Sequence, residues 1–110
     1  MEISIITAQR AVTAAGTPEQ IVEGVVNNHA ISVIIRALVA NTNDLYVTNT
    51  EQRATATTTG HILGPGEVLA INLDQFRTKD CSQAYIDLAK IWVDAAVNGE
   101  GFTYMAVLLQ

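Results

Sequence analysis

The stretch "KIWVDAAVNGEGFTYMAVLLQ", residues 90–110, decides the fold, because its letters fit two different structures. Apolar residues around Trp92 recur at helical spacing, which predicts an amphipathic helix that Gly99 would end. The same letters also predict a β-hairpin, with a strand through Trp92, a turn at 98–101 and a second strand from Phe102. The β-branched and aromatic "IWV" favours the hairpin, since such residues are enriched in strands. The pattern alone keeps both structures open.

The segment 30–40, "AISVIIRALVA", predicts a strand more clearly. Ile31, Val33 and Ile35 alternate with residues of mixed polarity, as expected for a strand covered fully on one face and partly on the other. The Asn- and Asp-rich segment 41–44 then predicts a turn, since these residues tolerate left-handed backbone geometry. "LYVTN" follows and predicts a second hairpin.

The remaining segments extend the same pattern. "LGPGE" at 63–67 predicts a turn, and "VLAINLD" after it predicts a strand. Residues 1–16 are β-branched and alanine-rich, which predicts an N-terminal arm or an edge strand. The polar segment 50–61 is typical of a loop with short extended pieces, and 75–83 of a loop or a short turn of helix. We therefore expect one all-β domain over 1–110, an antiparallel sandwich of seven to eight strands, of jelly-roll or immunoglobulin-like type.

Composition points to a protein that is covered by partners. Hydrophobic residues make up 49% of the 110 residues and charged residues only 15%, against about 25% in typical soluble domains. A small domain with so little surface charge is expected to bury part of its surface against other subunits. The segments 1–16 and 102–110, which we expect at sheet edges, also contain neither lysine nor proline, the residues that usually protect an exposed edge from pairing with another strand.

Charge and hydropathy exclude other classes of partner. The net charge of −5 and the six scattered basic residues argue against binding to a nucleic acid backbone. No apolar run is long enough to span a bilayer as a helix, and the N-terminus does not resemble a signal peptide, so we expect no membrane partner. Cys81 is the only cysteine, which excludes an intrachain disulfide.

The chain shows no pattern of an enzyme. His29 and His61 are far apart in sequence, without the spacing of a metal or catalytic motif. Asp87, Asp94 and Glu100 are more consistent with solvated edge charges than with an acid/base pair. We therefore expect no catalytic residue, no cofactor and no metal site.

Three motifs resemble small β-sandwich proteins of tailed bacteriophage virions. They are "NDLYVTN" at 43–49, "LGPGEVLAINLD" at 63–74 and "IDLAKIWVDAAVNGEGFTYMAVL" at 86–108. The resemblance covers roughly residues 30–110, but the threonine-rich 50–61 segment departs from it and residues 1–29 match no motif. It favours the hairpin for the C-terminal stretch. It also implies a non-enzymatic virion component assembled in the host cytoplasm, either a capsid decoration (cement) protein or another head or tail appendage.

The resemblance also implies partners. Decoration proteins of this kind are commonly trimers that bind the major capsid protein, so a homotrimer on the head lattice is the first expectation. A carbohydrate- or receptor-binding module of a phage tail or head fibre is the alternative. An aromatic platform of Trp92 and Tyr104 would serve such a module, but the pattern favours a core or subunit-interface position for these two rings.

The sequence thus predicts two sets of residues, one buried and one in contact with partners. We expect the core to include Ile31, Val33, Ile35, Leu45, Val47, Leu69, Ile71, Leu73, Ile91, Val93 and Val107. We expect contacts with neighbouring subunits or the shell to involve Ile3, Ile5, Ile6, Arg10, Trp92, Asn98, Glu100 and Tyr104.

Overall fold

The computed structural model describes residues 3–22, 29–48, 61–72 and 85–109. These segments form strands and one short 3-10 helix, η2 (Leu88–Lys90). The nine strands among them are β1 (Ile3–Ala11), β2 (Glu19–Gln20), β3 (His29–Ala37), β4 (Leu45–Thr48), β5 (His61–Leu63), β6 (Val68–Asn72), β7 (Ile86–Asp87), β8 (Trp92–Ala95) and β9 (Gly101–Leu109). The predicted all-β fold is therefore confirmed, with one or two more strands than expected because β2 and β7 are only two residues long.

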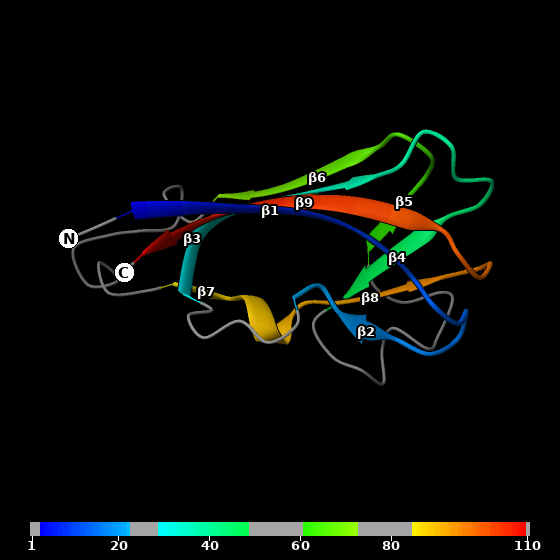
Figure 1. The fold of residues 1–110 in the computed structure, drawn as a ribbon, viewed down its shortest axis with the longest axis horizontal. Helices are drawn as coiled ribbons and strands as arrows, with labels where there is room; N and C mark the ends of the chain where they lie inside the picture. Colours follow the sequence, from blue (N-terminus) through cyan, green and yellow to red (C-terminus); the bar gives the residue numbers. More distant parts are fainter. Residues whose placement is uncertain (1–2, 23–28, 49–60, 73–84, 110) are drawn as a thin grey trace.

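The strands form two antiparallel sheets that pack face to face as a sandwich (Figure 1). The larger sheet has the order β1-β9-β3-β6, with β7 also pairing with β3, and the smaller sheet has the order β2-β8-β4-β5. When β7 is set aside, the first strand pairs with the last, the second with the seventh, the third with the sixth and the fourth with the fifth. This nested pairing is that of a jelly roll.

The C-terminal stretch forms strands, as predicted, but it does not form a hairpin. β8 pairs with β2 and β4 in the smaller sheet, whereas β9 pairs with β1 and β3 in the larger one. The connection at 96–100 is therefore an arch between the two sheets. The second predicted hairpin is wrong for the same reason, because β3 and β4 also lie in different sheets.

Two glycines make the C-terminal arch possible. Gly99 has a φ of +85°, and its N–H donates to the carbonyl of Val12 at 2.8 Å. A Cβ on Gly101 would lie 2.5 Å from Cδ1 of Leu38 and 3.3 Å from the carbonyl oxygen of Arg10. The chain thus turns with a left-handed residue and then enters β9 through a gap that has no room for a side chain.

Most of the predicted core is confirmed. The buried cluster between the sheets contains six of the predicted residues, namely Val33, Ile35, Leu45, Val47, Ile91 and Val93. Leu69 and Ile71 are half-buried and pack against this cluster from β6, which is an edge strand. The largest fully buried side chain is Phe102, which was not among the predicted core residues.

The predicted burial of Ile31 and Val107 is wrong, because the alternation between the two faces of the strand differs from the predicted one at both positions. The register between β3 and β9 shifts between Ala30 and Ser32, so Ile31 is the extra residue of a β-bulge and Ala30 occupies the buried position. On β9 the buried side chains are Phe102, Tyr104, Ala106 and Leu108, which places Val107 on the opposite face. Leu73 lies outside the described residues.

The N-terminal segment is an edge strand and not a free arm. β1 pairs with β9 along nine residues, and Ile6 and Ala8 pack against the core. The predicted loops at 50–61 and 75–83 lie outside the described residues, apart from His61, which begins β5. Within the described segments no helix has the length and apolarity needed to cross a membrane.

Candidate functional site: an uncovered sheet face

The outer face of the larger sheet is built from aligned rows of side chains across four strands. One row runs from Thr7 through Met105 and Ile34 to Ala70. The next row runs through Gln9, Thr103, Arg36 and Val68. Because successive side chains of a strand alternate between faces, these residues point away from the core that their neighbours fill. We call this surface the outer sheet face.

The outer sheet face is more apolar than a solvated surface needs to be. Ile5 is 62% exposed, Val68 53% and Met105 38%, and the three lie on three different strands. Arg36 is the only charged side chain among the described face residues of β1, β9, β3 and β6. A chain with a net charge of −5 therefore has a face of nearly neutral character. Contiguous exposed apolar residues of this kind mark interaction surfaces.

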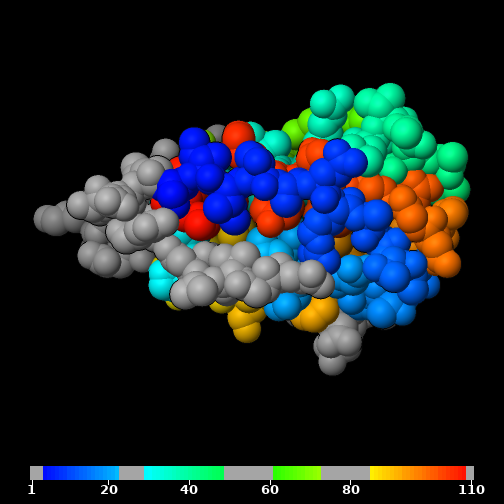
Figure 2. Space-filling model, in the orientation of Figure 1, coloured from blue at the N-terminus to red at the C-terminus, as the bar shows by residue number. Residues whose placement is uncertain are grey.

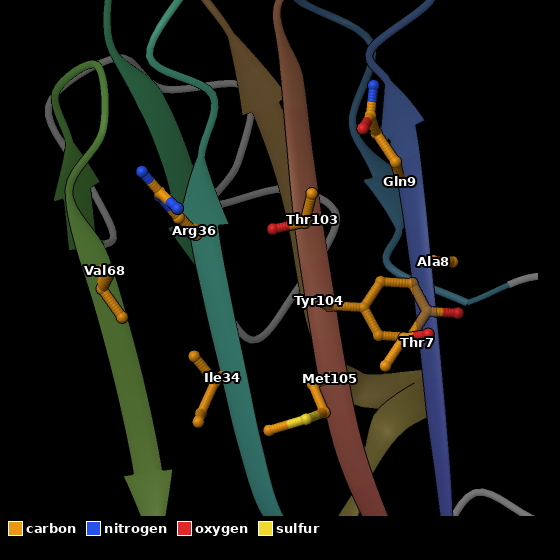
Figure 3. A pocket seen from close by; sticks show the side chains of 9 residues that line it. All are labelled: Thr7, Ala8, Gln9, Ile34, Arg36, Val68, Thr103, Tyr104 and Met105. Carbon is orange, nitrogen blue, oxygen red and sulfur yellow. The ribbon is translucent and has the colours of Figure 1, made fainter.

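A groove of about 440 Å³ runs over the middle of this face. Figure 3 shows side chains from all four strands around it, with Arg36 between Val68 and Thr103, and with Ile34 beside Met105. A second hollow of about 310 Å³ adjoins it and shares Arg36 and Thr103 with the first. Arg36 is therefore the one charged side chain that lines both hollows.

The structure separates the four predicted N-terminal contact residues. Ile5 lies on the outer sheet face, whereas Ile6 points to the core. The guanidinium of Arg10 forms an ion pair with Glu19 at 3.2 Å and donates to the carbonyl of Gln20, so it ties β1 to β2. The backbone of Ile3 pairs with Leu109 at the end of the β1–β9 ladder.

The four predicted C-terminal contact residues do not form one surface. Trp92 is half-buried on β8 and Tyr104 is buried on β9, in different sheets, so they form no aromatic platform. Asn98 is exposed on the arch, and its side-chain oxygen accepts the N–H of Ala15 at 2.6 Å. Asn98 thus ties the arch to the segment that follows β1.

The interpretation of the carboxylates as solvated charges is wrong for two of them. Asp94 is 3% exposed and accepts the N–H groups of Gly16 and Ala95 at 2.9 and 2.8 Å. Glu100 is 5% exposed and accepts hydrogen bonds from Thr42 and Asn43. The Asp94 carboxylate therefore ties the turn at Gly16 to β8, and the Glu100 carboxylate ties residues 42–43 to the arch. Such hydrogen bonds are what a buried charge needs in order to be tolerated.

Val68, Met105 and Thr103 were not predicted from the sequence to be surface residues of interest. A signal for them existed, because the alternation in 30–40 already placed Ile34 and Arg36 together on the second face of a strand. The sequence pattern did not reveal that β3 pairs with β9 and β6, and this pairing brings the side chains into the rows of the outer sheet face.

Comparison of the chain with protein-family models, curated proteins and solved structures gives no match. Among the described residues, no group of three or more histidine, cysteine, aspartate or glutamate side chains is arranged to hold a metal ion. The outer sheet face is the candidate functional site because of its exposed apolar side chains.

Proposed function

We propose that the protein is a non-enzymatic structural component of a bacteriophage virion, a capsid decoration protein that self-associates, binds the head lattice and stabilises it. The observation that carries this proposal is the outer sheet face, with Ile5, Val68 and Met105 exposed and only Arg36 charged. Such a face suits a flat, largely apolar contact with another protein surface.

The fold supports the proposal by analogy. Jelly rolls occur in viral capsid proteins, and they also occur in lectins and in cupins, so the architecture fits a virion role without selecting it. The resemblance of 86–108 to virion proteins supports the virion role over the other two. The first hollow on the outer sheet face is lined by side chains from all four long strands of the larger sheet, so a large partner could contact all four at once.

The proposal is tested with phage heads that lack the protein. Purified protein is mixed with such heads, and the bound fraction is measured after sedimentation. Met105→Lys and Val68→Lys would each place a charge in the docked face, so we expect binding to fall at least tenfold. Val97→Lys is the matched control, because Val97 is also an exposed apolar residue, 41% accessible, but lies on the arch and not on the face.

Equal binding by all three variants would contradict docking through the outer sheet face. Failure of the unaltered protein to bind any head would contradict the virion proposal itself. Circular dichroism of each variant shows whether the fold is intact, so that loss of binding can be separated from unfolding.

One observation favours a second candidate, a glycan- or receptor-binding module. Tyr85 is 46% exposed and stacks on His29 with ring centroids 3.8 Å apart. Exposed aromatic rings can stack on the apolar faces of sugars. A glycan array probed with the unaltered protein and with Tyr85→Ala tests this candidate, which predicts a hit that the substitution abolishes.

A further inference from the structure

The edge of the larger sheet at β1 is the feature that the proposed function does not explain. β1 is at the end of the sheet order, and no described strand pairs with its second side. Its atoms lie at the surface of the near face along the length of the strand in Figure 2. A strand of nine residues is long for an edge without a partner strand among the described residues.

The hydrogen-bond pattern shows which backbone groups point outward from β1. The N–H of Val12 donates to the carbonyl of Glu100 at 2.9 Å, and the carbonyl of Val12 accepts the N–H of Gly99 at 2.8 Å. In an antiparallel ladder such residues alternate with residues whose N–H and C=O point away from the partner strand. Counting back from Val12 in steps of two, the inward residues are Arg10, Ala8, Ile6 and Ser4.

The outward residues are therefore Ile5, Thr7 and Gln9, with Ile3 and Ala11 at the two ends. The N–H of Thr13, next in this series, also leaves the ladder and donates to the Glu19 carboxylate at 2.8 Å, as the pattern requires. The side chains of Thr7 and Gln9 lie on the outer sheet face. The open edge and the apolar face are thus continuous.

The side chains of this edge are compatible with self-pairing. The only charged residue of β1 is Arg10, whose guanidinium is held by Glu19 and by the carbonyl of Gln20 on the core side. Two copies of a chain with a net charge of −5 can therefore meet at this edge without bringing like charges together. No lysine, no proline and no bulge in β1 opposes addition of a strand.

We propose that β1 pairs antiparallel with β1 of a second copy about a two-fold axis at Thr7. This register pairs all nine residues of one strand with all nine of the other, and it sets every outward residue opposite another outward residue. Ile5 of each copy then lies beside Gln9 of the other, and the two outer sheet faces merge into one surface. A two-fold contact of this kind is closed and uses the same patch twice.

The contact does not depend on the proposed virion function, and it gives a different subunit number. The resemblance implies a trimer, whereas pairing through β1 closes at two copies. Solution mass, measured without any phage particle, therefore tests the β1 contact, and binding to heads tests docking on the virion.

The first experiment compares the masses of variants by sedimentation equilibrium at tens of micromolar. We expect the unaltered protein to be a dimer. Thr7→Pro removes the outward N–H at the axis, which an edge strand tolerates on its open side, and should give a monomer. Thr7→Lys should also give a monomer, because a lysine on an open sheet edge disfavours pairing with another strand. This variant replaces Thr7→Pro in the test if Thr7→Pro does not fold.

Met105→Lys is the control, because Met105 pairs with Thr7 in the same row but lies on the central strand β9. It should leave the dimer intact. A monomer or trimer for the unaltered protein would overturn the proposal, as would a dimer that Met105→Lys dissociates and the Thr7 variants do not.

The second experiment tests the register by disulfide trapping in a Cys81→Ser background. Across a hydrogen-bonded antiparallel pair the Cα atoms are about 5.5 Å apart, within the range that a disulfide spans. Thr7→Cys should therefore form a covalent dimer on mild oxidation. Gln9→Cys should not, because Gln9 would face Ile5 of the other copy. The reverse result would overturn the Thr7-centred register.

Discussion

Glu100 shows how much of this fold depends on single side chains outside the apolar core. Its buried carboxylate accepts hydrogen bonds from the N–H of Thr42 at 3.1 Å, from Oγ1 of Thr42 at 2.8 Å and from the N–H of Asn43 at 3.2 Å. Beside it, the side chain of Asn41 donates to the carbonyl of Gly101 and accepts its N–H, both at 2.8 Å. Two arches that are 58 residues apart in sequence are thereby fixed to each other.

We expect Glu100→Gln to destabilise the protein by roughly 1.5–3 kcal/mol, because hydrogen bonds to a charged group are stronger than those to a neutral one. The free energy of unfolding is measured by urea denaturation. Glu67→Gln is the control, since Glu67 is exposed and its carboxylate also accepts a backbone N–H, that of Gly64. A loss for Glu100→Gln no larger than that for Glu67→Gln would contradict the structural role assigned to Glu100.

The loss of stability when a core residue is truncated should depend on how deeply its side chain is buried, more than on its position in the sequence pattern. Ile35 is fully buried on a central strand, so Ile35→Ala should lose about 2–5 kcal/mol of stability. Ile71 is only half-buried on the edge strand β6, so Ile71→Ala should lose clearly less. Urea denaturation of both variants measures the difference, and equal losses would mean that β6 is covered more completely than the structure indicates.

At the scale of the element, the arch at 96–100 makes a test of local geometry possible. Gly99 has a positive φ, and a Cβ added there would meet no atom within 4 Å, so Gly99→Ala should lose only the strain of a left-handed residue, about 1–2 kcal/mol. Gly101→Ala should lose more, because its methyl group would overlap Leu38 and approach the backbone of Arg10. Thermal unfolding of the two variants checks this order, and a milder effect at Gly101 would show that Leu38 can move aside.

Sequence alternation was enough to predict the strands but not their partners. The faces of 33–35 and the burial of Leu45 follow from local pattern, because one face of a sandwich strand must be apolar. An arch between sheets and a hairpin within a sheet need the same turn residues, so Gly99 could not distinguish them. The bulge at Ile31 depends on the register with β9, a contact some 75 residues away along the chain, and no local signal encodes it.

The outer sheet face was predictable in part for the same reason. Ile5 was identified because it lies in an unblunted N-terminal strand, and this part of the prediction agrees with its exposure. Met105 and Val68 belong to the face only because β9 and β6 flank β3, which is long-range information. Glu100 was interpreted as a solvated edge charge of a hairpin, and the jelly-roll pairing buries it.

At the scale of the whole molecule, β1 is an integral part of the sandwich. It pairs with β9 along its full length, and Ile6 and Ala8 cover the core. Deletion of residues 1–10 should therefore abolish cooperative folding and not merely weaken assembly, since it uncovers β9 and part of the core at once. A cooperative thermal transition in the truncated chain, followed by near-ultraviolet circular dichroism, would be inconsistent with this role of β1. Thr7→Lys, which keeps the strand, is the folded control.

The pairing of Ile3 with Leu109 has a mechanical consequence. It places the start of β1 beside the end of β9 at one end of their ladder, as Figure 1 shows where N and C are marked. Tension applied between these two residues would load one backbone pair at a time, so the ladder would unzip at low force. Tension applied between Thr13 and Leu109 would instead shear the whole ladder and share the load among all of its hydrogen bonds. In optical-tweezers measurements the second attachment should therefore resist a markedly higher force than the first.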